Sequence, residues 1–184
     1  NQERDSVFSA YNYTIKGDWI RNNTNVFVNG KNCETNLFGA YQPTGSEHID
    51  NHTIVDHLAA HCESNEHYKG TIADKATGVF NGKVFVRKDS QKINAFQSNN
   101  NVLLSDEATM NSKPELEIYA DDVKCSHGST SGQLDDEAVF YLQSRGLSKK
   151  SATALLIGAF LGEVVEKIEI PELKEKVLEL YGME

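Results

Sequence analysis

The sequence predicts a mainly β protein that ends in a small α-helical segment, and three observations support this. Residues 1 to about 130 contain many short runs of β-branched and aromatic residues, separated by Gly, Asn and Asp. No helical period in this part continues beyond two turns. After Gly132, apolar residues recur at helical spacing instead. We therefore expect a β core over residues 1–132 and a helical subdomain over residues 133–184.

The expected strands are short, and polar segments such as QPTGSE, NGK and SNNN separate them. The dipeptide NG at 29–30 and 81–82 is compatible with hairpins, and hence with a β-sandwich. Short runs with polar ends suit stacked coils equally well, because each run can pair with its equivalent one coil away. Both architectures remain open at this point. The runs are NVFV (25–28), NLFGAY (36–41), HTIV (52–55), GVFNGKVFV (78–86), INAFQ (93–97), NVLL (101–104) and LEIYA (116–120).

Three helices are expected in the C-terminal segment. The first covers LDDEAVFYLQSRG, with acidic residues in its first turn and Gly146 as its stop signal. Ser148 can cap a second helix over about 149–167, which carries a wide apolar stripe. Pro171 suits the first position of the third helix.

Composition excludes several classes of function. The formal net charge of −9 and the pI of about 5.1 argue against nonspecific binding to nucleic acid or to an anionic membrane. No apolar run approaches the roughly 18 residues that indicate a spanning helix. The three cysteines, Cys33, Cys62 and Cys125, are too few for a disulfide framework. They fit a reducing compartment, so we expect a cytoplasmic location.

The segment DVKCSHGST (122–130) places Cys125 and His127 two residues apart. On a strand, residues i and i+2 share a face, so the thiol and the imidazole can reach one point. We expect Gly128 to end this strand. Two ligands do not complete a tetrahedral zinc site, which takes four. Spacing alone leaves open half of a metal site, a nucleophile and its base, or two packed side chains.

A second segment, HIDNHTIVDHLAAHCESNEH (48–67), holds five histidines beside Cys62. On a strand, His57 and His61 would share a face and Cys62 would point away. No zinc-type pattern such as C-x₂-C is present. The alternatives are solvated or stacked turn histidines and a weak metal site, and we expect no metal in the isolated chain. The histidines are His48, His52, His57, His61 and His67.

Longer stretches resemble a known family. ELEIYADDVKCSHGSTSGQLDDEAVFYLQSRGLSKKSATALLIGAFLGEVVEKI (115–168) is similar to the C-terminal part of the SufB/SufD family of iron–sulfur cluster assembly proteins, and the SufD branch is the better match. GVFNGKVFV, AFQSNNNVLLS and HIDNHTIVDHLAAHCESNEHYKG also look like this family. The similarity runs from about residue 25 to the end. It implies the C-terminal portion of a longer family chain.

The resemblance implies a right-handed parallel β-helix followed by helices, and a non-catalytic scaffold subunit of a SufBCD complex. A SufB-like subunit would pair side by side with this chain through its β-helix. When the chain is isolated, a second copy could pair with it instead. An iron–sulfur cluster would form transiently near that junction. His127 lies where the SufD pattern carries its functional histidine, and Cys125 matches the same motif. The SufC ATPase would dock on the helices, where Phe140, Tyr141 and Arg145 are the candidate contacts.

Two other functions compete with the scaffold. A β-helix enzyme acting on polysaccharide would need a groove with clustered acids or with Lys or Arg bases. Asp121 and Asp122 are adjacent, so they would face opposite sides of a strand, which suits a paired-carboxylate site poorly. A zinc-binding module built on the histidines is the third alternative.

Overall fold

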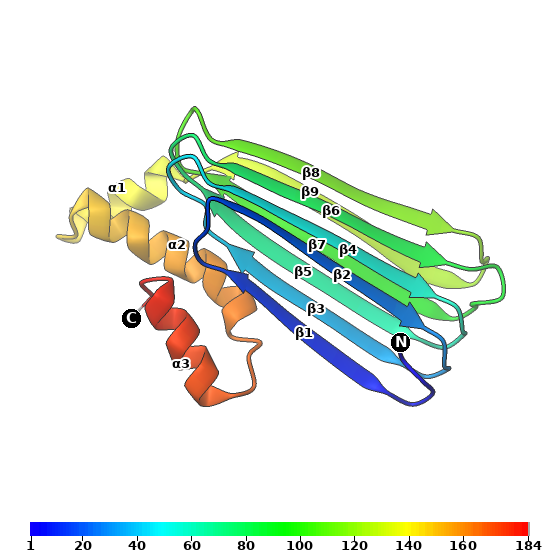
Figure 1. The fold of residues 1–184 in the computed structure, drawn as a ribbon. Coiled ribbons are helices and arrows are strands. Elements are labelled where there is room, and N and C mark those ends of the chain that lie inside the picture. The colour runs from blue at the N-terminus through cyan, green and yellow to red at the C-terminus, as the bar shows by residue number, and fades with distance from the viewer. Residues whose placement is uncertain (184) are drawn as a thin grey trace.

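The computed structural model describes residues 1–183, which form a parallel β-solenoid with helices at one end (Figure 1). Odd-numbered strands make one sheet, in the order β1-β3-β5-β7-β9, and even-numbered strands make the other, in the order β2-β4-β6-β8. The strands are β1 (Val7–Thr14), β2 (Trp19–Val28), β3 (Glu34–Tyr41), β4 (His48–His57), β5 (Glu63–Ile72), β6 (Thr77–Val86), β7 (Ile93–Leu103), β8 (Thr109–Ile118) and β9 (Val123–Gln133).

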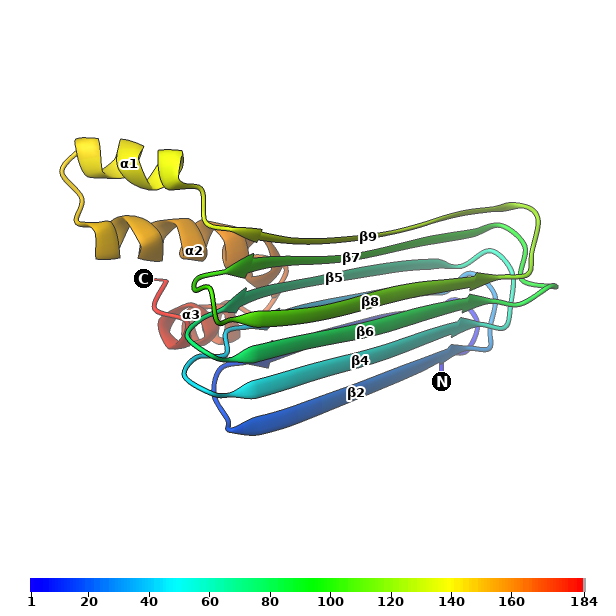
Figure 2. The ribbon, with the colours of Figure 1, turned by 90° about the horizontal axis from the view of Figure 1, so that it is seen from above.

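Each coil of the solenoid takes about 30 residues. Glu34 pairs with Glu63, and Glu63 with Asn94, in unbroken parallel register. The chain therefore alternates between the two sheets, as Figure 2 shows from above. This confirms the parallel β-helix followed by helices that the resemblance implied, and it decides against the sandwich.

Two details of the strand prediction were wrong. INAFQ and NVLL are parts of one strand, β7, because the intervening SNNN segment is extended. NGK at 81–83 lies inside β6 and forms no turn. Asparagine side chains are accommodated inside the solenoid: Asn99 Nδ2 donates to Tyr41 Oη at 3.0 Å, and Asn101 Nδ2 donates to Asn99 Oδ1 at 2.8 Å.

The three helices begin and end close to the predicted positions. Ser148 Oγ accepts a hydrogen bond from the Ser151 amide at the start of the second helix, and Pro171 occupies the first turn of the third. Gly146 has φ +97°, the left-handed conformation expected after a helix. The helices are α1 (Asp136–Ser144), α2 (Lys149–Val165) and α3 (Pro171–Leu180). Within residues 1–183, none of them combines the length and apolarity that a membrane crossing requires.

Helices α2 and α3 pack on the five-stranded sheet near the carboxyl ends of its strands (Figure 1). Tyr181 Oη lies 2.7 Å from the carbonyl oxygen of Ala40, and Tyr13 Oη donates to the carbonyl of Val164 at 2.7 Å. The buried Lys69 Nζ lies 2.6 Å from Glu163 Oε2. The helical segment therefore shares a hydrophobic cluster with β1 and β3.

Candidate functional site

Strands β8 and β9 form the open end of the solenoid. β9 is the last strand of its sheet and β8 the last strand of the other, so among residues 1–183 each is paired on one side only (Figure 2). The two edges face each other, and Ser129 Oγ of β9 lies 2.7 Å from Ser112 Oγ of β8. Unpaired edge strands present free backbone donors and acceptors and are common sites of strand addition.

Cys125 and His127 lie on β9 and point toward the interior at this open end. Their register partners on β7, Ala95 and Gln97, are both buried, so side chains at these positions face the solenoid core. Cys125 is partly buried against the core, and burial raises the pKa of its thiol. His127 is exposed. The prediction that the two side chains share a face is confirmed.

The expectation that Gly128 ends the strand was wrong. β9 continues to Gln133, so His127 lies in mid-strand. His127 is nevertheless exposed, because no further coil covers this end of the residues that the structure describes. An inward-facing imidazole that is open to solvent is available to a ligand or a partner.

A buried polar pair lies directly beneath His127. Glu66, Gln97 and His127 are register partners on β5, β7 and β9, so they form one row across the sheet. Gln97 Nε2 donates to Glu66 Oε2 at 2.6 Å, and the two side chains belong to residues that are only 3% and 4% exposed. Burial raises the pKa of Glu66 to about 7, against the opposing effect of the neighbouring Thr53 and Gln97 side chains.

Sequence reasoning missed Glu66 and Gln97. The one signal was a polar residue at an inward position of an alternating run, as Gln97 is in INAFQ. Buried polar atoms usually have partners, yet the Oε1 atoms of both side chains find none among residues 1–183.

The histidines of the 48–67 segment lie apart. His48 stacks on Trp19, with ring centroids 6.1 Å apart, and His52 Nε2 lies 2.8 Å from Asp50 Oδ1. His57 is fully buried, with Nε2 3.0 Å from Ser64 Oγ. His67 faces outward beside Lys69, and burial followed by this positive charge lowers its pKa.

The predicted alignment of His57 with His61 was wrong. The chain turns between β4 and β5, and His61 adopts a left-handed conformation in that turn, with φ +62°. Among residues 1–183, no group of three or more His, Cys, Asp or Glu side chains is placed to hold a metal ion.

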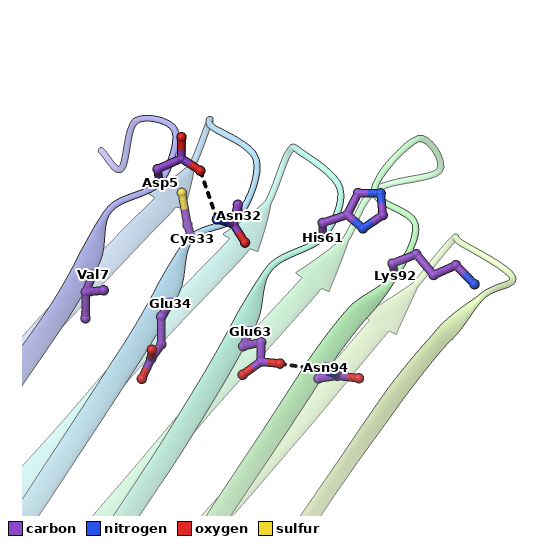
Figure 3. Close-up of a pocket in the computed structure, with 9 residues that line it drawn as sticks. All are labelled: Asp5, Val7, Asn32, Cys33, Glu34, His61, Glu63, Lys92 and Asn94. Atoms are coloured by element: carbon purple, nitrogen blue, oxygen red, sulfur yellow. Dashed lines mark hydrogen bonds between the residues drawn. The ribbon is translucent and has the colours of Figure 1, made fainter.

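A shallow groove runs along the amino ends of the odd-numbered strands (Figure 3). Two of its acidic side chains are bound across neighbouring coils: Asn32 Nδ2 donates to Asp5 Oδ1 at 2.8 Å, and Asn94 Nδ2 donates to Glu63 Oε1 at 3.1 Å. The same left-handed turn recurs in successive coils, at Asp5, Asn32, His61 and Lys92. These hydrogen bonds and repeated turns are what a structural corner of the solenoid requires.

The candidate docking residues lie on α1 and directly after it, at Arg145. Phe140, Tyr141 and Arg145 are exposed, and the Arg145 guanidinium lies 5.3 Å from the Tyr141 ring centroid. A largely apolar groove lies elsewhere, between α2 and the C-terminal end of α3, and none of these three residues lines it. Its lining includes Leu155, Gly158, Ala159, Gly162, Leu178 and Met183.

Comparison with known proteins identifies the family. Residues 1–160 match the family described as "SUF system FeS cluster assembly, SufBD core domain". The chain is 37% identical over 178 residues to the iron–sulfur cluster assembly protein SufD of Escherichia coli, covering 97% of this chain and 42% of that protein. It is 32% identical over 183 residues to a SufBD family protein of Mycobacterium leprae, covering 95% of this chain and 47% of that protein.

A relative is also found in a plant. The chain is 34% identical over 178 residues to the Arabidopsis thaliana protein named ABCI7, chloroplastic, covering 95% of this chain and 37% of that protein. The chain thus spans less than half the length of these curated relatives. The parallel solenoid, the family match and these identities together show that the chain belongs to the SufBD family of iron–sulfur cluster assembly proteins.

Proposed function

We propose that this chain is a SufD-like, non-catalytic scaffold subunit that pairs with a SufB-type subunit through its open end. The observation that carries the proposal is that β9, which among residues 1–183 is paired on one side only, is also the strand that presents Cys125 and His127. A partner strand added along this edge would bring its own side chains next to this pair. Since the edge is exposed in the isolated chain, we expect a second copy to occupy it when the SufB-type subunit is absent.

The pair supplies half of a cluster-binding site. Iron in clusters is held mainly by soft thiolates, and imidazole can replace a thiolate. In the proposed complex the partner supplies a thiolate and His127 supplies an imidazole, while the cluster itself is transient cargo. Burial favours the neutral thiol of Cys125, so we assign His127 the leading role and Cys125 a supporting one.

Two further observations support a scaffold and a reducing compartment. In the groove at the amino ends of the odd-numbered strands, Asp5 and Glu63 accept hydrogen bonds from asparagines, which supports a non-catalytic chain. Cys33, Cys62 and Cys125 are free thiols, which supports a cytoplasmic location.

Substitution of His127 tests the proposal. His127→Ala is expected to lower the free energy of unfolding by no more than about 1.5 kcal/mol, because the side chain is exposed and contributes at most one hydrogen bond. In the complex with SufB- and SufC-type subunits, the variant is expected to lose cluster formation, whereas His127→Cys restores part of it. The measurements are cluster absorbance of the purified complex and urea denaturation of the chain.

The matched control is Ser126→Ala, an outward-facing change on the same strand, which should leave cluster yield unchanged. Normal cluster yield with His127→Ala, or a loss accounted for by unfolding, would contradict the proposed role of His127.

We also propose that a SufC-type ATPase docks on the helical segment. Deleting residues 133–184 is a poor test, since it uncovers the cluster that α2 and α3 share with β1 and β3. Surface variants are sharper: Phe140→Ala with Tyr141→Ala on α1, and Leu155→Asp in the α2–α3 groove.

We expect at least one of these two variants to weaken SufC binding by tenfold or more, on the order of 1.4 kcal/mol, measured by calorimetry. The control is Glu172→Ala, at the exposed start of α3. Unchanged affinity in both variants, with circular dichroism showing folded chains, would refute docking at these two surfaces.

A further inference from the structure

The amide of Gln97 has a fixed orientation. Its Nε2 donates to Glu66 Oε2 at 2.6 Å, so the amide oxygen is directed away from that carboxyl group. Gly82 on β6 lies against the same nitrogen: a Cβ atom at this position would be 2.5 Å from Gln97 Nε2. A side chain at position 82 would therefore displace the amide. The hydrogen bond to Glu66 selects one of the two amide orientations, and the close approach of Gly82 restricts the space around the amide.

The oxygen of this amide is a buried acceptor without a donor. Gln97 Oε1 is enclosed and finds no hydrogen-bond partner within residues 1–183. A buried carbonyl without a donor is energetically unfavourable, so a hydrogen bond from any donor that can reach it is favoured. Its register partner on the neighbouring strand is His127. Side chains in register on adjacent strands have Cβ atoms about 5 Å apart, within reach of an imidazole N–H.

The other inward neighbours of His127 are less well placed to orient its ring. Ser129 Oγ donates to Ser112 Oγ at 2.7 Å, which directs this hydroxyl across the open end toward β8, although its oxygen can still accept. Because Ser129 lies opposite Ser112, strand alternation places Pro114 opposite His127, and its side chain has no polar atom. On the same strand, Cys125 provides only a weakly polar thiol. Gln97 is therefore the polar group that is placed to orient the imidazole.

We infer that Gln97 is a positioning residue for His127: when the exposed imidazole turns inward, the amide oxygen of Gln97, which has no partner among residues 1–183, accepts one imidazole N–H, and the lone pair of the other ring nitrogen is directed at the open end. Glu66 acts one step further away by holding the Gln97 amide in the required orientation. This gives His127 one tautomer and one ring orientation. Histidine ligands generally donate their second N–H to such a group, which fixes the tautomer. The inference rests on the proposed role of His127 in cluster assembly.

The first test is the tautomer of His127 in the chain itself, read from nitrogen-15 chemical shifts of labelled histidine at a pH where the ring is neutral. The wild type is expected to show a single dominant tautomer. Gln97→Leu should shift this ratio toward the mixture of a free imidazole, because the acceptor is gone. Glu66→Gln should preserve it, since a glutamine oxygen can still accept from Gln97 Nε2. Thr71→Val, which removes another buried and unpartnered polar atom, is the matched control.

If Gln97→Leu does not fold, Gly82→Ala is the second variant, because it displaces the Gln97 amide without removing it. A tautomer ratio of His127 that is unchanged in the folded Gln97→Leu or Gly82→Ala variant would overturn the inference.

The second test separates the inference from the proposed function. In the complex with SufB- and SufC-type subunits, Gln97→Leu is expected to lower cluster yield by about tenfold or more, the usual effect of removing a group that orients a metal-binding histidine. If His127→Ala abolishes the cluster and Gln97→Leu leaves it normal, the positioning role is refuted while the scaffold function stands. If His127→Ala itself gives a normal cluster yield, the proposed function fails, and the role of Gln97 in cluster assembly fails with it.

Discussion

The effect of Glu66→Gln on the free energy of unfolding is expected to depend on pH. At pH 8 it should be more stabilising than at pH 4.5 by about 3 kcal/mol. The side chain is buried inside the solenoid, and burial raises its pKa from 4.5 to about 7. Below pH 4.5 the carboxyl group is protonated in both the folded and the unfolded chain. Between pH 4.5 and 7 the unfolded chain releases the proton and the folded chain retains it, so stability falls as pH rises. Glutamine has no such proton and avoids this loss.

The measurement is urea denaturation of both proteins at intervals from pH 4.5 to 8. The matched control is Glu63→Gln, which makes the same change in charge at an exposed position on the same strand. Its effect should not vary in this way with pH. A constant difference between Glu66→Gln and the wild type over the whole range would show that Glu66 is not held neutral by burial.

The helices could be predicted closely because their signals are local. Ser148 as a cap, Pro171 in a first turn and Gly146 with positive φ each act within a few residues of their own position. Such signals can be identified in one sequence without knowledge of what packs against the helix. The docking of α2 on β3 and β5 could not be foreseen in this way, since it depends on contacts such as that between Lys69 and Glu163.

The coil structure could not be predicted from composition because stacked coils repeat geometry more strictly than residue type. Glu63 pairs with Asn94, and Asn94 with Lys124, so three different side chains occupy equivalent positions. Polar segments also failed as markers of turns. Asn99 and Asn101 bond to each other inside the solenoid, where a neighbouring coil supplies the remaining partners. The resemblance to a known family supplied the architecture that these patterns left open.

The candidate site was predicted in part. The shared face of Cys125 and His127 follows from strand periodicity alone, and the register confirms it. That β9 is an edge strand depends on the number and order of coils, which no local pattern determines. The row formed by Glu66, Gln97 and His127 joins residues about 30 positions apart, so it is visible only once the register is known.

His57→Gln is expected to remove a loss of stability of about 3 kcal/mol that the wild type undergoes as pH falls from 6.5 to 4. Burial lowers the pKa of His57 from 6.5 to about 4, although the nearby negative charge of Asp56 opposes this. Above pH 6.5 the ring is neutral in both states. Below pH 6.5 the ring is protonated in the unfolded chain but stays neutral in the folded chain, so stability falls until about pH 4. Glutamine can still bond to Ser64 and does not titrate.

Glu66 and His57 therefore act in opposite directions over their common range, pH 4.5 to 6.5. As pH falls through this range, Glu66 adds stability and His57 removes it, by about 1.4 kcal/mol per pH unit each. Urea denaturation gives the unfolding free energy of each variant minus that of the wild type. As pH falls, this difference should rise for His57→Gln and decline for Glu66→Gln. The double variant should parallel the wild type. The control for a lost histidine is His61→Asn, in the exposed turn. If the difference in unfolding free energy between His57→Gln and the wild type does not change with pH, the ring of His57 is not held neutral by burial.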